Sequence, residues 1–381
     1  MQQRWVIAMT KICVYVICKN ELKFVRDTDW LHRVLEADKI LMLDTGSTDG
    51  TYEYLKEIEK VNDKLVVYRK EYGDSFRFDV ARNDALDLAF DDKFDVYVSV
   101  DCDEFFEQGW SNHIREAWIK NKYERVEYWY SHGCDAYGNP KDIYRYNKIH
   151  SAGWRWSGAV HEYLFKPGFD EYSEHTAALD LFDKIKLYHR QDFTKPREYF
   201  ELLKVRAEEE NDINCRFYLG GEYMQQGDYE EALKIFFSIV VDNRSDFDNF
   251  CAYSRIAECY LYSGDKLKAI KYILRCLEMN DTYRNPWFLL AEIYGSMELW
   301  ATAIKTIEMA LVKTYNHQDW FETGEDWNGR EYDLLSLYHY YNGNYKQSYE
   351  NVCLALERYP NDERIINNKI LIERELKEDN K

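Results

Sequence analysis

DVYVSVDCDEFF, residues 95–106, is the stretch that decides how the first half of the chain folds. Its β-branched and aromatic residues at 96–100 predict a strand. The strand ends on three carboxylates, Asp101, Asp103 and Glu104, which resist burial unless a cation or hydrogen-bond donors compensate them. Asp101 and Asp103 are two residues apart, so in an extended chain their side chains share a face and can share a divalent ion. A solvated acidic turn is the alternative, because a D-x-D sequence is common by chance.

Length and charge restrict the class of protein. The chain has 381 residues, which is enough for two domains that each bury a core. It carries 50 Lys and Arg against 69 Asp and Glu, a net charge of −19. Duplex nucleic acid and an anionic membrane surface are therefore repelled over most of its surface, and we expect no nucleic-acid partner; a local basic groove stays open as an alternative.

Cysteine usage and hydropathy indicate the compartment. The nine cysteines are an odd number and contain no C-x-x-C pair, which argues against a disulfide framework and a structural zinc site. The apolar run within residues 1–18 is too short to span a bilayer, and we find no cleavable signal pattern or other membrane span. We therefore expect a cytoplasmic protein.

Strands and helices alternate in the sequence before residue 95. Buried strands are predicted at 12–18, 40–43 and 65–69. Helices are predicted from about 22 to 36, 52 to 58 and 78 to 90. The second strand leads into the Gly-containing turn DTGSTDGT, residues 44–51. A strand, a Gly-rich turn and a helix outline a nucleotide-binding α/β unit whose ligands lie at the carboxyl ends of the strands.

Polar residues follow two of these strands. Asp44 and Asp101 each stand at a strand end, and such ends lie side by side in a parallel sheet, where two acids can hold a base edge and ribose hydroxyls. Arg82, on the helix that Asp79 is expected to cap, offers a planar donor fork nearby. Simpler explanations stay open: Asp44 can be a turn residue that binds its own backbone, and Arg82 an exposed helix residue.

Four motifs then follow one another in a recognisable order: ICVYVICKNE (12–21), DTGSTDGT (44–51), FDVARNDAL (78–86) and VSVDCDEFF (98–106). Over roughly residues 11 to 106 they resemble family 2 of the glycosyltransferases with the GT-A fold. The resemblance implies a Rossmann-like α/β domain, a nucleotide-sugar donor (usually a UDP-sugar), a Mn²⁺ or Mg²⁺ ion, and transfer with inversion at the anomeric carbon.

The resemblance also implies residue roles. The segment Ile17 to Glu21, with Asn20, and Asp44 would border the nucleotide base. Arg82 would help to hold the base, Asp101 would meet the ribose or the sugar, and Asp103 would ligate the metal. Cys102, also in the donor site, stands where the family more often has a small residue such as Ala.

Two later stretches, WRWSGAVHE (154–162) and KLYHR (186–190), resemble bacterial family members that glycosylate peptides, including the S-glycosyltransferases of glycopeptide bacteriocins. His189 is the expected second metal ligand, because a neutral imidazole adds a donor atom without more negative charge beside the diphosphate. It can equally be a structural, hydrogen-bonded histidine.

Inversion needs a base that takes the acceptor's proton. We predict Glu162 for this role, with His161 and Glu104 in reserve. Glu104 is also a candidate contact to acceptor or sugar. Trp154 and Trp156 either stack on a sugar or are residues of the core and its rim.

Residues 214–381 change to paired amphipathic helices. The small residues Ala232, Ala269, Ala303 and Ser348 align at steps of 37, 34 and 45, and a period near 34 is typical of tetratricopeptide repeats. The long last step holds an insertion at about 316–329. A helix over about 361–378, apolar at Ile365, Ile366, Ile370 and Leu371, is expected to cap the array.

We therefore predict a GT-A domain at 1–193, a linker helix at 194–213 and tetratricopeptide-like repeats at 214–381. The predicted activity is that of a metal-dependent inverting glycosyltransferase, a hexosyl- or N-acetylhexosaminyltransferase. Its repeats would present a peptide or protein acceptor, or mediate homodimerisation. The alternatives are a non-catalytic interaction protein with a relic GT-A domain, and the same chemistry on a glycan or lipid.

Overall fold

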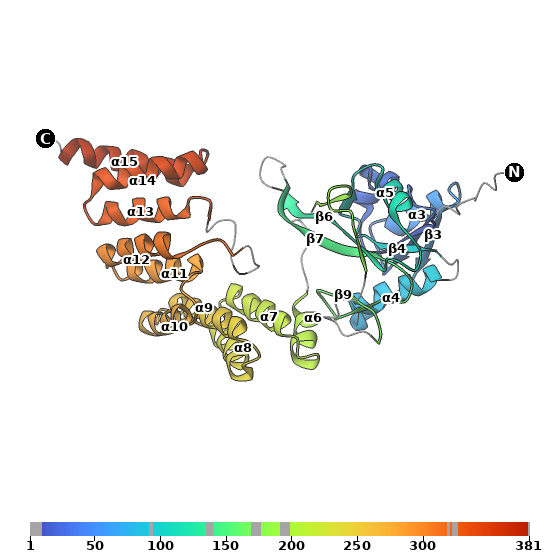
Figure 1. Ribbon diagram of the computed structural model, residues 1–381, viewed down its shortest axis with the longest axis horizontal. Coiled ribbons are helices and arrows are strands. Elements are labelled where there is room, and N and C mark those ends of the chain that lie inside the picture. Colours follow the sequence, from blue (N-terminus) through green and yellow to red (C-terminus); the bar gives the residue numbers. More distant parts are fainter. Residues whose placement is uncertain are drawn as a thin grey trace. The chain divides into compact units, whose positions relative to one another are not determined.

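The computed structural model describes residues 10–90, 94–134, 140–168, 177–190, 199–317, 321 and 327–379. It divides into two compact units between Arg206 and Ala207, and this division falls inside the segment predicted as a linker. There, helix α6 (Phe200–Lys204) continues into a π-helical segment, Val205–Glu209. The predicted start of the linker helix, at 194–198, lies outside the described residues. The first unit combines a sheet with helices, and the second is helical (Figure 1).

Within the described residues, nine strands form the main sheet of the first unit. They are β1 (Ile12–Cys18), β2 (Lys39–Asp44), β3 (Leu65–Arg69), β4 (Val96–Ser99), β5 (Glu104–Phe106), β6 (Arg125–Cys134), β7 (Pro140–His150), β10 (Ala178–Asp180) and β11 (Lys186–His189). The order is β3-β2-β1-β4-β7-β6-β11-β5, with β10 paired to β6. Strands β8 (Arg155–Ser157) and β9 (Tyr163–Phe165) form a separate antiparallel pair.

The sheet is mixed, and this brings distant residues together. Strands β1 to β4 pair in parallel, with Cys18 of β1 opposite Asp44 of β2 and Tyr15 of β1 opposite Ser99 of β4. Asp44 therefore lies beside one edge of β1, and β4 leads toward the same end along its other edge. Strand β7 runs antiparallel to both β4 and β6. Strand β11 lies antiparallel to β5, which places His189 opposite Glu104. The parallel strands β1 to β4 were predicted by alternating strands and helices. The rest of the sheet combines antiparallel pairs with the parallel pairing of β6 to β10 and β11, and it depends on long-range pairing.

Five helices of the first unit are α1 (Leu22–Asp27), α2 (Trp30–Val34), α3 (Thr51–Glu59), α4 (Phe78–Ala89) and α5 (Trp110–Ala117). The helix predicted over about 22–36 is two helices. Its break lies at Thr28, whose hydroxyl donates to the Phe24 carbonyl and accepts from the Trp30 amide. The N-cap prediction for Asp79 is wrong: α4 begins at Phe78, and the Asp79 carboxylate accepts from Arg77 and from the Gly158 amide instead.

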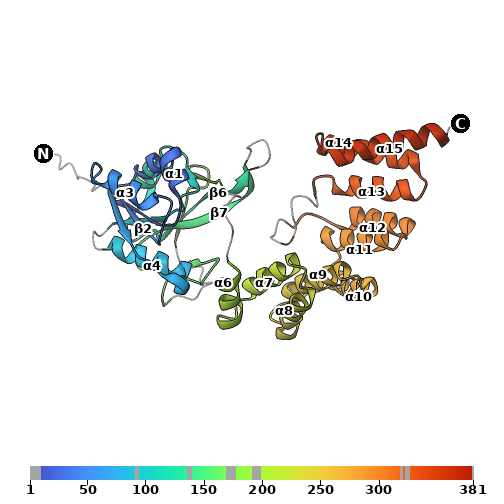
Figure 2. The same ribbon diagram turned by 180° about the vertical axis from the view of Figure 1, so that it is seen from behind.

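The second unit contains α7 (Ile213–Gln225), α8 (Tyr229–Asp242), α9 (Asp246–Tyr262), α10 (Lys266–Met279), α11 (Arg284–Ser296), α12 (Trp300–Lys313), α13 (Arg330–Tyr341), α14 (Tyr345–Arg358) and α15 (Glu363–Asp379). Figure 2 shows these helices following one another in chain order. The turns between α7 and α8 and between α9 and α10 show why these helices form pairs. Gly227 and Gly264 take a positive φ, and the next residues, Asp228 and Asp265, accept a hydrogen bond from the first turn of α8 and α10.

Burial in the second unit follows the predicted repeat. The four aligned small residues, Ala232, Ala269, Ala303 and Ser348, are fully buried. The prediction for the capping helix is only partly right. Helix α15 buries Ile365 together with Ile372, whereas Ile366, Ile370 and Leu371 remain exposed.

Two further features concern membrane spans and cysteines. No helix in the described part of the chain has the length and apolar character needed to cross a membrane. The eight cysteines whose side chains are described are all free thiols, and seven of them are buried.

Candidate active site

The carboxylate of Asp101, two residues after the end of β4, lies between two cations. Arg82 of α4 places Nη1 2.8 Å from Oδ1, and Lys148 of β7 donates from Nζ to Oδ2 at 3.2 Å. Both cations are buried, with exposed fractions of 4% and 7%. Burial raises the pKa of the Asp101 carboxyl, but the charges of Arg82 and Lys148 outweigh it and hold this pKa well below its usual value. Asp101 is therefore an ionised member of a network and not a solvated turn residue.

Arg82 extends the network to Glu162. Its Nε donates to Glu162 Oε1 at 2.5 Å, its Nη1 donates to Ser99 Oγ at 3.3 Å, and its guanidinium lies 5.0 Å from the ring centre of Trp156. A planar guanidinium presents several donors at fixed angles, which suits a bridge between two carboxylates. The alternative of an exposed helix residue is therefore wrong for Arg82.

Glu104 closes the network on the other side of Lys148. Its Oε1 accepts from Lys148 Nζ at 3.1 Å and from the Tyr130 hydroxyl at 3.2 Å, while its Oε2 accepts from the Asp101 amide at 2.9 Å. Burial and the charge of Glu104 both raise the pKa of Tyr130, so its hydroxyl stays a donor. Glu104 is only 2% exposed. Its predicted reserve roles, as base or as acceptor contact, remain predictions that require the side chain to become accessible.

Asp103 and His189 form a second, more accessible pair. The distance from His189 Nε2 to Asp103 Oδ2 is 3.1 Å, and the side chains of His189 and Asp103 are 17% and 27% exposed. The pairing of β11 with β5 and the hydrogen bond from the Arg190 amide to the Asp103 carbonyl hold the two residues together. Burial lowers the pKa of His189, but the hydrogen bond and charge of Asp103 raise it by more.

The chemistry of this pair fits a divalent ion. A carboxylate oxygen and an imidazole nitrogen are donors that Mn²⁺ accepts, and Mg²⁺ takes the carboxylate. Among the described residues, no group of three or more His, Cys, Asp or Glu side chains is arranged to hold a metal. Asp103 and His189 would supply such an ion with one carboxylate oxygen and one imidazole nitrogen.

The predicted base-binding loops are tied to each other. Asp44 is fully buried, and its Oδ1 accepts from the amides of Gly46 and Ser47, as its alternative role as a turn residue predicts. Asn20 has a φ of 58°, its amide donates to Ser47 Oγ, and its Oδ1 accepts from the Thr48 amide. The loops after β1 and β2 thus form one unit, and their contact to a base stays a prediction.

Three further predicted donor residues lie close by. Ile17 is half-buried at the end of β1, and the Glu21 amide donates to Thr51 Oγ1 at 2.9 Å. Cys102 is buried, and its burial raises the pKa of the thiol well above its usual value. A neutral buried thiol contributes packing more than charge.

Trp154 and Trp156 are buried. Trp156 donates from Nε1 to the Tyr15 hydroxyl, and its backbone forms two hydrogen bonds with the side-chain amide of Asn83. The structure thus gives Trp156 the position of a core residue, and a contact of either tryptophan with a sugar stays a prediction.

The loop between β8 and β9 carries the predicted bases. Glu162 points into the network, as its bond to Arg82 shows, whereas the His161 side chain is exposed. His161 has a φ of 50°, a left-handed conformation that is uncommon for residues other than glycine. The structure therefore brings Glu162, Arg82 and Asp101 together and does not add the imidazole of His161 to them.

Sequence reasoning missed Lys148 and Tyr130. Both come from the antiparallel pair β6 and β7, and their contacts to Glu104 span 44 and 26 residues of sequence. One signal was present. Tyr146, Lys148 and His150 alternate along β7, and a lysine on the inward face of a strand requires a carboxylate partner.

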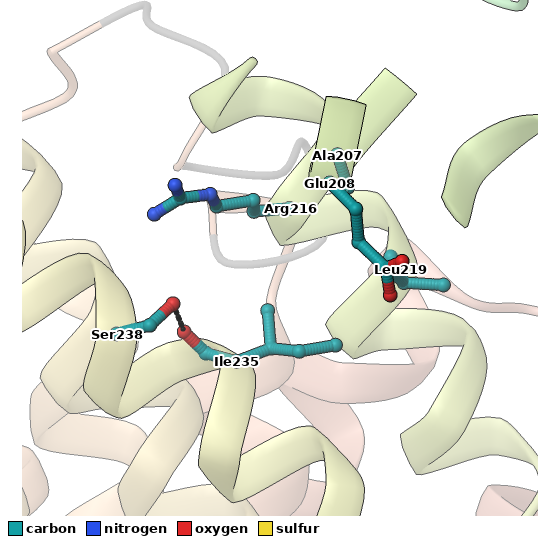
Figure 3. Close-up of a pocket in the computed structure, with 6 residues that line it drawn as sticks. All are labelled: Ala207, Glu208, Arg216, Leu219, Ile235 and Ser238. Carbon is teal, nitrogen blue, oxygen red and sulfur yellow. Dashed lines mark hydrogen bonds between the residues drawn. The ribbon is translucent and has the colours of Figure 1, made fainter. Parts of the chain in front are cut away.

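One cavity of about 330 Å³ lies in the second unit. Its lining comprises Ala207, Glu208, Arg216, Leu219, Ile235 and Ser238 (Figure 3). Arg216 pairs with Asp242 at 2.5 Å, and Ser238 donates to the Ile235 carbonyl at 2.7 Å. None of the predicted site residues lines this cavity, so it is separate from the candidate active site.

The comparison with protein families finds a match that lies within the first unit. The model of glycosyl transferase family 2 matches residues 13–163, a range that contains Arg82, Asp101, Asp103 and Glu162 but not His189. No curated protein matches the chain. The likeness to S-glycosyltransferases of bacteriocins is not among these findings and stays a prediction.

Several solved structures are similar to part of the chain. A MamA protein is 21% identical over 42% of this chain and 80% of its own, with a TM-score of 0.32. A tetratricopeptide repeat protein of Thermus thermophilus, TTC0263, is 16% identical over 46% and 88%, with a TM-score of 0.36. One from Parabacteroides merdae is 18% identical over 46% and 65%, also at 0.36.

The predicted fold class is confirmed: a GT-A-like unit precedes helical repeats of the tetratricopeptide type. The helix pairs and their buried small residues define the repeats. Residues 13–163 form a glycosyl transferase family 2 domain, and this domain supports glycosyltransferase activity.

Proposed function

We propose that this chain transfers a sugar from a UDP-sugar to a peptide or protein side chain, with inversion at the anomeric carbon and with the help of a divalent ion. The observation that carries the proposal is the position of Asp103 beside His189, next to the buried network of Arg82, Asp101 and Glu162. These groups lie where the sheet of a family 2 domain ends, which is where ligands bind in such α/β folds.

Asp103 and His189 are the residues that would hold Mn²⁺ or Mg²⁺. The ion, when bound, supplies Lewis-acid stabilisation of the departing diphosphate. The side chains of both residues are partly exposed, which leaves them within reach of a ligand. Asp101 lies two residues away with its carboxylate 30% exposed, and we assign it the ribose or sugar hydroxyls.

Glu162 is the base in this proposal. The acceptor attacks the face of the anomeric carbon opposite the leaving group, so one carboxylate near that face must take its proton. Arg82 holds Oε1 of Glu162 at 2.5 Å, and we assign the acceptor's proton to the other oxygen, Oε2. Because Arg82 also binds Asp101, it fixes the base relative to the donor site.

The helical repeats support an acceptor made of protein. Arrays of stacked helix pairs offer extended surfaces for peptides, and four such pairs precede α15 in the described part of the chain. A protein that kept the fold without turnover and acted only through its repeats is the competing interpretation. A third is transfer to a glycan or lipid. An assay of turnover distinguishes an active transferase from a non-catalytic interaction protein. Removal of the repeats distinguishes a protein acceptor from a glycan or lipid acceptor.

The test is a panel of nucleotide sugars, scored for nucleotide release with and without EDTA. We expect one donor to turn over, EDTA to abolish turnover, and Asp103→Asn to lower it at least tenfold. Asp63→Asn, which changes an exposed acid of the same unit, is the control. In thermal unfolding, UDP with Mn²⁺ at about 100 times Kd should stabilise the wild type by about 2.7 kcal/mol. The absence of both turnover and stabilisation would favour the non-catalytic interpretation.

A further inference from the structure

Arg206, the last residue of the first unit, is buried although it is charged. Its exposed fraction is 4%, and it lies in the π-helical segment Val205–Glu209. Its Nη1 donates to two successive backbone carbonyls, those of Val160 and His161. The guanidinium also lies 5.4 Å from the ring centre of Tyr163. These three contacts surround Glu162 in the sequence, so Arg206 binds the backbone on which the predicted base is mounted.

The same loop is anchored from its other side by the first turn of α4. The Gly158 amide donates to Asp79 Oδ2 at 3.0 Å, and the Phe78 amide donates to the Ala159 carbonyl at 3.0 Å. Each of the four residues from 158 to 161 therefore has a backbone group held by α4 or by Arg206. Helix α4 also carries Arg82, so the base and its ion-pair partner share one support.

The loop conformation itself requires such support. His161 has a φ of 50°, and a residue other than glycine persists in that strained region only where its surroundings determine it. Gly158 has a φ of 104°, and a Cβ at this position would overlap the guanidinium of Arg206. The close approach of Arg206 to the loop thus depends on glycine at 158, and the two residues form one packing unit.

We propose that Arg206 is a positioning residue: by binding the carbonyls of Val160 and His161 it sets the location of the Glu162 carboxylate. This inference rests on the proposed function, in which Glu162 is the base. The contacts of Arg206 named above involve Val160, His161 and Tyr163, and not the residues that we assign to the nucleotide-sugar donor and its ion. Its loss should therefore slow the chemical step without weakening donor binding, because a misplacement of about 1 Å in a reacting group can cost roughly 100-fold in rate.

The experiment compares the full-length wild type with Arg206→Met, Arg206→Lys and the control Lys204→Met. Lys204 belongs to the adjacent helical turn and forms a more exposed pair with Glu201. Three measurements are made on each protein: amide hydrogen exchange of the peptide covering 158–163, the Kd of UDP with Mn²⁺ by calorimetry, and kcat and KM for the accepted nucleotide sugar.

In Arg206→Met we expect the amides of residues 158–163 to exchange at least tenfold faster and kcat to fall by about 10- to 100-fold. The Kd of UDP and the KM of the donor should change by less than about threefold. Arg206→Lys should recover part of kcat, and Lys204→Met should match the wild type. Should Arg206→Met fail to fold, Arg206→Lys serves for the same comparison, with smaller effects of the same pattern.

Two results would overturn the inference: unchanged exchange in 158–163, or equal losses of kcat and donor affinity, which indicate a merely structural role. Failure of the proposed function is recognised separately. In that case the wild type itself turns over no nucleotide sugar, and the exchange measurement alone decides whether Arg206 holds the loop.

Discussion

At the scale of single residues, Arg82 is the group on which the buried network depends, because it binds both Asp101 and Glu162. Arg82→Met removes the cation that binds Glu162 and leaves Asp101 with Lys148 alone, and removing one partner of a buried ion pair costs about 3–5 kcal/mol. Urea unfolding of the wild type and the variant measures this loss. Arg155→Met is the matched control: its pair with Asp87 is 36% and 57% exposed, so we expect a loss below about 1 kcal/mol. Equal losses in the two variants would contradict the network.

His150 gives the first unit a pH-dependent stability. It is fully buried, its Nε2 lies 2.8 Å from the Tyr15 hydroxyl, and burial lowers its pKa from 6.5 to about 4. Between these two values the unfolded chain binds a proton that the folded protein does not. The free energy of unfolding therefore rises with pH across this window and falls on acidification, by up to about 3 kcal/mol from this group.

The measurement is urea unfolding at pH 7.5 and pH 4.5. We expect the wild type to lose about 2–3 kcal/mol more than His150→Gln over this interval, because the glutamine does not titrate. Parallel losses in the two proteins would show that His150 does not contribute.

Local sequence indicated some residues of the site and not others. Asp101, Asp103 and Arg82 stand in short motifs at predicted strand ends or on a predicted helix, so their type and spacing were informative. Lys148, Tyr130 and Arg206 act through contacts 26 to 46 residues away in sequence, and nothing in their immediate neighbours indicates the partner. Whether Asp44 is buried or exposed likewise depends on packing that a turn motif does not reveal.

At the scale of elements, α7 contains an internal comparison of two adjacent glycines. A Cβ on Gly220 would lie 2.5 Å from Phe236 of α8, whereas a Cβ on Gly221 would meet nothing within 4 Å. Gly220→Ala should therefore destabilise the second unit by about 1–3 kcal/mol through overpacking. Gly221→Ala should stabilise it by about 0.5–1 kcal/mol, because alanine loses less entropy than glycine in a helix.

Thermal or urea unfolding followed by circular dichroism checks both glycine variants. The opposite signs are the informative result, because the two substitutions are chemically identical and differ only in the face of α7 on which they lie. If both variants were stabilised, the close packing of α7 on α8 would be wrong.

Elements with a strong local pattern were predicted well. The apolar run at 12–18 forms β1 with the predicted bounds. A strand that is buried on both faces has a continuous apolar sequence, so its ends are visible in the sequence. The single helix expected over 22–36 is interrupted at Thr28, because its side-chain hydroxyl competes for backbone hydrogen bonds. On α15, single-helix periodicity did not indicate which apolar residues face α14, since that choice belongs to the packing of two helices.

At the scale of the whole molecule, the charge is distributed unevenly between the two units. The second unit, residues 207–381, holds 32 Asp and Glu against 19 Lys and Arg, so it carries most of the net charge of −19. An acidic repeat unit favours cationic segments among peptide acceptors and makes their association faster at low ionic strength. The groups assigned to the donor lie in the other unit, so the proposed function predicts that donor and acceptor recognition are separable.

That separation predicts the outcome of removing the repeats. A chain that ends at Arg206 retains Asp101, Asp103, Glu162 and His189, so we expect it to bind UDP with Mn²⁺ within about threefold of the full-length Kd and to release nucleotide from the accepted donor. Transfer of radiolabelled sugar to the proteins of a cell lysate should fall at least tenfold, because the acceptor surface is gone. Circular dichroism and the UDP titration establish that the shortened chain is folded. Undiminished labelling of lysate protein would place acceptor recognition in the first unit, and labelling of the glycan or lipid fraction alone would replace the protein acceptor in the proposal.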